Sequence, residues 1–156
     1  TGSIKSNIKF GKRKASHEEI VHSAKVAQAY DFINKKEKKF DEHIGEGGSN
    51  VSGGQKQRLS IARALVRKPE IYIFDDSFSA LDFKTDAILR AELKKETTHA
   101  IVLIVAQRIG SIMDADKIIV LDEGNVVGIG KHKELLKTCS VYKEIALSQL
   151  TEEELA

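Results

Sequence analysis

The sequence predicts an α/β fold, and three observations lead to this prediction. Apolar residues recur at helical spacing through Gln55–Arg67, a helix that Lys68-Pro69 ends. Two short apolar runs follow, Ile71–Phe74 and Ile101–Val105, with a helical stretch, Lys84–Lys95, between them. The order strand, helix, strand is typical of a parallel strand pair joined by a crossover helix.

The N-terminal part is predicted to be helical and then irregular. Ser16–Glu19 has the pattern of a capping box, in which the first and fourth residues each bond the other's backbone at the start of a helix. Residues 34–50 are charged and rich in glycine, so we expect a solvated loop there. The predicted apolar face of the first helix consists of Ile20, Ala24, Ala27 and Tyr30, and that of Gln55–Arg67 consists of Leu59, Ala62, Leu65 and Val66.

The C-terminal part is predicted to be a β-hairpin followed by two helices. Lys117–Leu121 and Val126–Ile129 are apolar runs on either side of Asp122–Asn125, which has the composition of a hairpin turn. Lys131–Leu136 and Val141–Leu150 are the two helical stretches.

Composition excludes several classes of protein. The 156 residues suffice for one domain or part of one. The net charge of +2, from 25 basic and 23 acidic residues, argues against a dedicated nucleic-acid binder. Cys139 is the single cysteine, which excludes an internal disulfide or a cysteine-rich metal site and favours a reducing compartment. The five histidines lack metal-ligand spacing, and we expect neither a membrane-spanning segment nor a signal peptide.

Ser52, Gly53 and Gly54 precede the helix Gln55–Arg67 and are candidates for holding a phosphate. The first amides of a helix have no internal acceptor, and the helix dipole attracts anions there. Glycine lets the backbone approach a phosphate closely, and the Ser52 hydroxyl adds a donor. A capped helix after a flexible loop explains the same three residues without a ligand.

Asp75 and Asp76 are candidates for binding magnesium and acting as a general base. They follow Ile71–Phe74, which we expect to be a buried strand, and ligands of open α/β sheets gather at the carboxyl ends of strands. A carboxylate there can hold Mg²⁺ directly or through water. Ordinary turn aspartates at the end of a strand are the alternative.

Together these motifs resemble the C-terminal part of the nucleotide-binding domain of ATP-binding cassette (ABC) transporters of the exporter type. Val51–Gln55 matches the signature LSGGQ except for valine in place of leucine, and Lys56–Pro69 matches the helix after it. Ile71–Asp76 is similar to the Walker B strand and Ser79–Asp82 to the D-loop. Asp41–Gly48 resembles the exporter-specific segment before the signature, which in the family touches the transmembrane domain.

The resemblance implies a division of the fold. Residues 1–68 would form the helical subdomain with the signature. Residues 69–156 would form the C-terminal half of a RecA-like P-loop NTPase core with the Walker B strand, D-loop and switch loop. The Walker A sequence G-x-x-x-x-G-K-[ST] does not occur. In the family, the strand leading into Walker A lies between the equivalents of Ile101–Val105 and Lys117–Leu121, so we expect a gap in the sheet.

The resemblance also implies a site shared by two domains that pair head to tail around two ATP molecules, at the cytoplasmic face of the cell membrane. This chain's signature would serve the ATP of a second nucleotide-binding domain. Asp75 would bind Mg²⁺ through water, Asp76 would position the attacking water, and Gln107 would contact the terminal phosphate. The signature residues are Ser52, Gly53, Gly54 and Gln55, and the residues that would connect the two sites are Ser79 and Asp82.

Two departures from the family pattern fall in one composite site. Asp76 stands where the family usually has glutamate, and Gln107 stands where it has the switch histidine. This pattern resembles the degenerate half of heterodimeric multidrug exporters. The alternatives are a non-catalytic, ATP-dependent dimerisation or regulatory module, and a DNA-repair or chromosome ATPase, whose long coiled coils or zinc modules do not appear here. We expect the isolated chain to be inactive.

Overall fold

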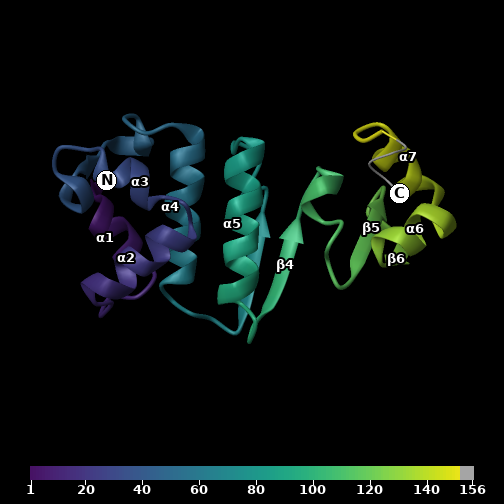
Figure 1. The fold of residues 1–156 in the computed structure, drawn as a ribbon, viewed down its shortest axis with the longest axis horizontal. Helices are drawn as coiled ribbons and strands as arrows, with labels where there is room; N and C mark the ends of the chain where they lie inside the picture. Colours follow the sequence, from purple (N-terminus) through teal and green to yellow (C-terminus); the bar gives the residue numbers. More distant parts are fainter. Residues whose placement is uncertain (152–156) are drawn as a thin grey trace. The chain divides into compact units, whose positions relative to one another are not determined.

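The computed structural model describes residues 1–151, and Figure 1 shows its helices and strands. The helices are α1 (Ile4–Lys9), α2 (His17–Val26), α3 (Tyr30–Asn34), α4 (Gly53–Leu65), α5 (Phe83–Glu96), α6 (His132–Thr138) and α7 (Ser140–Leu147). The strands are β1 (Gly2–Ser3), β2 (His43–Ile44), β3 (Ile71–Asp75), β4 (Ile101–Val105), β5 (Ile118–Asp122) and β6 (Asn125–Gly130). Short 3₁₀ turns span Lys39–Asp41, Glu46–Gly48 and Ile109–Ser111.

The described strands form three separate two-stranded sheets. β1 pairs with β2 and β5 with β6, both antiparallel, and β3 is the neighbour of β4. The predicted strand–helix–strand unit and the hairpin are therefore confirmed. Within the described residues β4 and β5 are not hydrogen-bonded neighbours. The gap expected in the sheet stays a prediction.

The chain divides into two compact units, residues 1–103 and residues 104–156. The boundary falls inside β4, and contacts between residues are denser within each unit than between the two units. The boundary predicted at residues 68 and 69 refers to the subdomains of the family and stays a prediction.

The helical part of the first unit has a fully formed core. Helices α1 and α2 both pack against α4. The predicted stripe of α4 is confirmed, because Leu59, Ala62, Leu65 and Val66 are all buried. Burying aliphatic side chains is the main source of stability in such a core. From the other helices the core receives Ile4, Ile8, Ile20, Ala24, Ala27 and Ile33.

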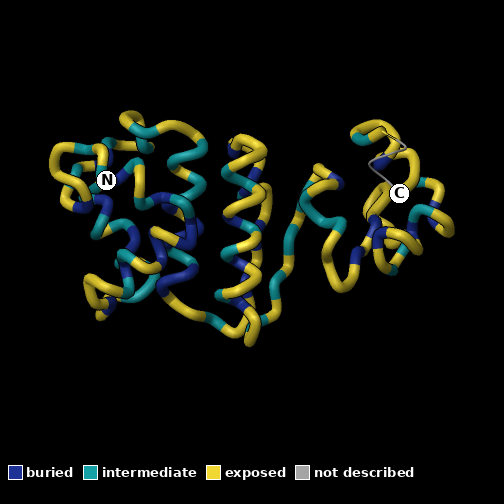
Figure 2. The backbone as a smooth tube through the Cα atoms, in the orientation of Figure 1, coloured by how far each residue is buried: buried dark blue, intermediate teal, exposed yellow. Residues whose placement is uncertain are grey.

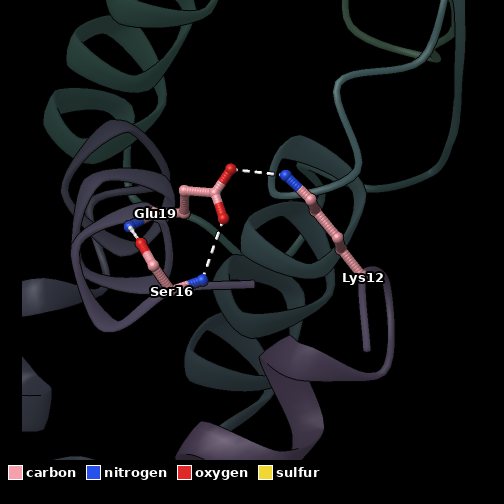
Figure 3. Close-up of polar contacts among 3 residues, drawn as sticks. All are labelled: Lys12, Ser16 and Glu19. Carbon is pink, nitrogen blue, oxygen red and sulfur yellow. Dashed lines mark hydrogen bonds and ion pairs between the residues drawn. The ribbon is translucent and has the colours of Figure 1, made fainter. Parts of the chain in front are cut away.

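The start of α2 is fixed by the predicted capping box (Figure 3). The Glu19 N–H donates to Ser16 Oγ over 3.2 Å, and the Ser16 N–H donates to Glu19 Oε2 over 2.9 Å. Lys12 donates to the other oxygen of Glu19. These bonds to Lys12 and Ser16 lower the pKa of the Glu19 carboxyl below its usual value.

The prediction of a solvated loop over residues 34–50 is wrong in part. Phe40 and Ile44 are only 7% and 8% exposed. Phe40 packs edge-on against the ring of His17, and Ile44 lies in β2, which pairs with Gly2 in β1. Phe40 and Ile44 are buried apolar residues in a segment with little regular structure, and the charged residues around them gave the segment the composition of a solvated loop.

The expectation that Ile71–Phe74 is a buried strand is confirmed for the strand but wrong for half of its burial. Tyr72 and Phe74 are buried and stack on each other, but Ile71 and Ile73 are 54% and 69% exposed. Side chains of a strand alternate between two faces. The face of β3 that carries the two isoleucines is therefore exposed within its unit. Figure 2 colours the backbone by the burial of each residue.

The second unit consists of the hairpin β5–β6 and helices α6 and α7. Its core includes Ile118 and Val120 from β5 and Leu135 from α6. Cys139, a free thiol only 6% exposed, lies beside Gly128, where a β-carbon would come 2.9 Å from the sulfur. The remaining core residues are Ile109, Tyr142 and Ala146.

Candidate functional site

The first turn of α4 carries the predicted phosphate-binding residues in a well-defined conformation. Ser52 is the N-cap, and its Oγ accepts the Gln55 N–H over 3.2 Å. The Gln55 Oε1 in turn accepts the Ser52 N–H over 3.1 Å. This reciprocal capping fixes both side chains locally. It leaves the amides of Gly53 and Gly54 at the helix start, where no helical acceptor exists.

Gly54 lies against the loop that follows β3. A β-carbon at Gly54 would come 2.8 Å from the backbone oxygen of Ala80, and one at Gly53 would lie 3.5 Å from Ala80 Cβ. A side chain at Gly54 would therefore push the loop away, so the glycine is required by the close approach. The structure thus brings the predicted signature residues and the predicted D-loop residues together.

Asp75 and Asp76 stand at the end of β3 and are both exposed. The Ser77 hydroxyl donates to the Asp75 backbone oxygen over 3.1 Å. Asp76 has a φ of 45°, in the left-handed region that aspartate enters more readily than most residues. The Ser79 hydroxyl lies 3.1 Å from Asp76 Oδ2 and 3.2 Å from the Asp76 backbone oxygen. The predicted base is thereby restrained by a predicted D-loop residue.

Asp82 caps helix α5. Its Oδ1 accepts the Thr85 N–H over 2.9 Å, and its Oδ2 accepts the Thr85 hydroxyl over 2.7 Å. These bonds, the backbone one first, lower the pKa of the Asp82 carboxyl. The first structural role of Asp82 is therefore to fix where the D-loop ends.

Asp75 fits a magnesium ion as one ligand among several. Mg²⁺ is usually held by one or two carboxylates together with phosphate oxygens and water. Within residues 1–151 no cluster of three or more histidine, cysteine, aspartate or glutamate side chains could hold a metal. A single carboxylate such as Asp75 suits an ion that brings most of its ligands with a nucleotide.

Gln107 lies in the second unit and is exposed. Its backbone oxygen accepts a hydrogen bond from Gln149 Nε2 over 2.7 Å. The other end of the same amide, Gln149 Oε1, accepts the Ile109 N–H over 2.9 Å. Gln149 thus holds the predicted switch loop against the end of α7. Gln107 belongs to the second unit, whereas Asp75 and Asp76 belong to the first.

The segment Asp41–Gly48 contains β2 and two 3₁₀ turns. Asn50 braces it, because its Oδ1 accepts the Gly45 N–H over 2.9 Å and its Nδ2 donates to the His43 oxygen over 2.7 Å. Asp41, Glu46 and Gly47 are exposed. The segment is therefore an exposed, hydrogen-bonded stretch of the first unit.

Gln57 and Arg58 are site residues that the sequence analysis missed. Gln57 bonds the loop after β3 through both ends of its amide. Arg58 Nη1 donates to the Gln28 oxygen over 2.7 Å, and its guanidinium stacks 4.9 Å from the centre of the Phe32 ring. Burial lowers the pKa of Arg58. Polar residues on a surface helix give no local signal of such contacts.

Comparison with known proteins settles the family. The sequence model of the family "ABC transporter" matches residues 2–79. The chain belongs to the ABC transporter family. Its fold is that of the ATP-binding domain of this family, and the match includes the signature helix α4, the Walker B strand β3 and the start of the D-loop.

Relatives of this ABC domain occur in a bacterium and in mouse. The chain is 46% identical over 153 residues to the "Uncharacterized ABC transporter ATP-binding protein YfiB" of Bacillus subtilis, covering 98% of the chain and 26% of that protein. It is 42% identical over 146 residues to mouse "ATP-binding cassette sub-family B member 5", covering 94% of the chain and 12% of that protein.

A solved structure of "a bacterial Atm1-family ABC exporter with ATP bound" matches with a TM-score of 0.91 at 36% identity, over 97% of the chain and 26% of that protein. The ABC domain described here therefore spans about a quarter or less of the length of these relatives. No helix within residues 1–151 has the length and apolar character needed to span a membrane.

Proposed function

We propose that this chain is the signature-bearing part of the ATPase of an ABC exporter, which couples ATP binding and hydrolysis to transport across a membrane. The observation that carries the proposal is the packing of Gly54 against Ala80, because it joins the signature to the D-loop in one rigid arrangement. The likeness to an exporter structure with ATP bound supports it. The domain would work at the cytoplasmic face of the membrane.

In the proposed site, the start of α4 serves the ATP of a second nucleotide-binding domain. The amides of Gly53 and Gly54 donate to the phosphate oxygens, assisted by the helix dipole. Ser52 and Gln55 hold these amides in place through their reciprocal bonds and add polar contacts. Preorganised donors of this kind stabilise the charge that develops on a transferred phosphoryl group.

Asp75 and Asp76 serve the ATP on this chain's own side. Asp75 would hold the Mg²⁺ that accompanies ATP, and Asp76 would orient the water that attacks the terminal phosphate. Magnesium, when bound with ATP, neutralises charge on the phosphates. Gln107 donates to the terminal phosphate from the switch loop that Gln149 supports. Ser79 and Asp82 fix the D-loop that joins the two sites.

This chain's own ATP site is proposed to be degenerate. The Asp76 carboxylate is one methylene shorter than glutamate and stands back from the attacking water. Gln107 can donate a hydrogen bond but carries no positive charge. Loss of a well-placed base costs about 10²–10⁴ in rate, or about 3–5 kcal/mol of barrier. The signature residues fit the complementary role of completing the active site of a different partner domain in a heterodimer.

The proposed partners are a second nucleotide-binding domain and the transmembrane domain of the same transporter. The braced segment Asp41–Gly48 is the proposed contact with the transmembrane domain. Nucleic acid is not among the proposed partners, because basic and acidic residues nearly balance.

ATP turnover by the full-length transporter tests the proposal. With the partner domain's catalytic carboxylate replaced, slow hydrolysis above background is expected from the site of Asp76. Complete absence of turnover, with ATP-dependent pairing of the domains retained, would favour the second candidate, a non-catalytic dimerisation module. Asp76 and Gln107 are the observations that favour that candidate.

Titration calorimetry of the isolated chain with Mg-ATP provides a second test. The chain lacks a Walker A loop, which makes most phosphate contacts in P-loop NTPases. We therefore expect no tight binding and no hydrolysis. A micromolar dissociation constant for the isolated 156-residue chain would contradict this assignment of the phosphate contacts.

A further inference from the structure

Gln57 in α4 holds the loop of residues 76–80 with three hydrogen bonds. Its Nε2 donates to the Asp76 backbone oxygen and to Ser79 Oγ, each over 3.0 Å. Its Oε1 accepts the Ala80 N–H over 3.0 Å. One side-chain amide thus spans the stretch from the predicted base to the D-loop. The roles given to the signature and the carboxylates leave these bonds unexplained.

Ser79 extends this arrangement to the carboxylate of Asp76. Its Oγ receives a hydrogen bond from Gln57, and its one hydroxyl proton is shared between Asp76 Oδ2 at 3.1 Å and the Asp76 backbone oxygen at 3.2 Å. The order of donors therefore runs from Gln57 through Ser79 to Asp76. Linked hydrogen bonds of this kind orient and polarise one another.

The backbone at Asp76 needs external support. Its φ of 45° is unusual for a residue with a side chain, and such conformations persist when surrounding bonds determine them. The bond from Gln57 Nε2 to the Asp76 oxygen supplies one such constraint. Gly54, three positions before Gln57 in α4, also lies close to the loop, since a β-carbon there would come 2.8 Å from the Ala80 oxygen.

We propose that Gln57 is a positioning residue for ATP hydrolysis, which orients the Asp76 carboxylate through Ser79 and ties it to the signature end of α4. The proposal rests on the proposed function. Because Ser52–Gln55 serve the partner's ATP and Asp76 serves the chain's own, Gln57 joins the two ATP sites inside one domain. Displacement of the first turn of α4 would then move the carboxylate.

The test is steady-state ATP hydrolysis by the full-length transporter with the partner domain's catalytic carboxylate replaced. Gln57→Ala is expected to lower kcat about tenfold and to leave KM for ATP within about twofold, because Gln57 acts on the base and not on the nucleotide. Ser60→Ala, at an exposed position of the same helix, is the matched control and should change neither value. A raised KM with unchanged kcat would overturn the proposal.

Gln57→Glu is the control for a folding defect, because glutamate has nearly the same side-chain shape as glutamine. It keeps an oxygen for the Ala80 N–H and loses both donated bonds. We expect kcat to fall as in Gln57→Ala while the Ala80 amide stays protected from hydrogen exchange. Full activity in Gln57→Glu would overturn the proposal, because the donated bonds would then be dispensable.

A double-mutant cycle that combines Gln57→Ala with Ser79→Ala tests whether Gln57 acts on Asp76 through Ser79. If Gln57 acts through Ser79, the double variant should be about as slow as either single variant, roughly tenfold below the unaltered protein. Independent effects would multiply to about a hundredfold and would overturn the route. Absence of both ATP binding and hydrolysis in the unaltered transporter would overturn the proposed function itself, whereas hydrolysis that is insensitive to Gln57 would overturn only this inference.

Discussion

Apolar side chains are mostly buried in the helical region before residue 67, whereas many are exposed in the strands β3 and β4. In the helical region, Ile4, Ile8, Ile20, Ile33 and Ile61 are all buried. In β3 and β4, exposed aliphatic side chains alternate with less exposed residues. These exposed residues are Ile71, Ile73, Ile101, Leu103 and Val105.

This difference separates the two halves of the proposed ATPase chemistry. The signature rests on a core that the chain completes by itself. The carboxylates rest on strands with an apolar face that the described chain leaves open, and such faces are usually covered by another layer. The signature is therefore the more self-sufficient of the two elements.

The largest expected effect is on stability. Ile61→Ala in the helical core should lower the free energy of unfolding by about 2–5 kcal/mol, because it leaves a cavity. The matched change Ile73→Ala on the open face of β3 should cost less than about 0.5 kcal/mol, as for other exposed sites. Urea denaturation of the dilute chain measures both. Equal losses would mean that Ile73 is covered in solution and would break the comparison.

The next effect concerns the carboxylate region of the full-length transporter. Asp76→Glu combined with Gln107→His should raise hydrolysis at this chain's own site by about 10²-fold, because a longer base and a chargeable switch residue are restored. Either change alone should do less, since both act on one transition state. Turnover is measured with the partner's site disabled. A double variant as slow as the unaltered protein would show that other residues cause the degeneracy.

A smaller effect tests the local order of the signature. Ser52→Ala removes the cap of α4 and should cost about 1 kcal/mol of stability. Ser77→Ala removes a hydroxyl bond in the exposed carboxylate loop and should stay within about 0.5 kcal/mol. Thermal unfolding compares the two serines. A greater loss at Ser77 than at Ser52 would reverse the ranking of the two regions.

The smallest effect extends the comparison to the second unit and depends on pH. Burial lowers the pKa of His132, whose Nδ1 lies 2.7 Å from the Tyr142 hydroxyl oxygen. A lowered pKa in the folded state means that stability is fully present above the unfolded value of about 6.5 and is lost as pH falls below it.

Urea midpoints measured above and below that pH should therefore differ in the unaltered chain, and the difference should shrink in His132→Gln. His99→Gln, at an exposed position, is the control and should keep the full difference. An unchanged pH dependence in His132→Gln would assign the effect to other groups.

Long periodic elements were predictable from the sequence. The α4 stripe, the α2 capping box and the hairpin depend on residues close together in the chain, and all three are confirmed. The short helices α1 and α3 were missed, because five or six residues give too little periodicity. Phe40 was missed because its ring contacts lie in other elements.

At the candidate site, too, the sequence predicted the motifs but not the contacts between residues far apart in the chain. Motif spacing located the signature and the D-loop, and the structure brings Gly54 and Ala80 together. Exposure of Ile73 could not be predicted, because it depends on which layers cover the sheet. The three bonds of Gln57 could not be predicted either, because they join positions about twenty residues apart through the fold.

The lone thiol of the chain has a practical consequence. Cys139 is buried against Gly128 in the second unit and is the only cysteine of the sequence. A thiol reagent reaches the buried sulfur of Cys139 when the second unit opens locally. The alkylation rate of Cys139 then depends on how often this unit opens, and no cysteine has to be introduced to measure it. The rate of Cys139 alkylation therefore reports local opening of the second unit.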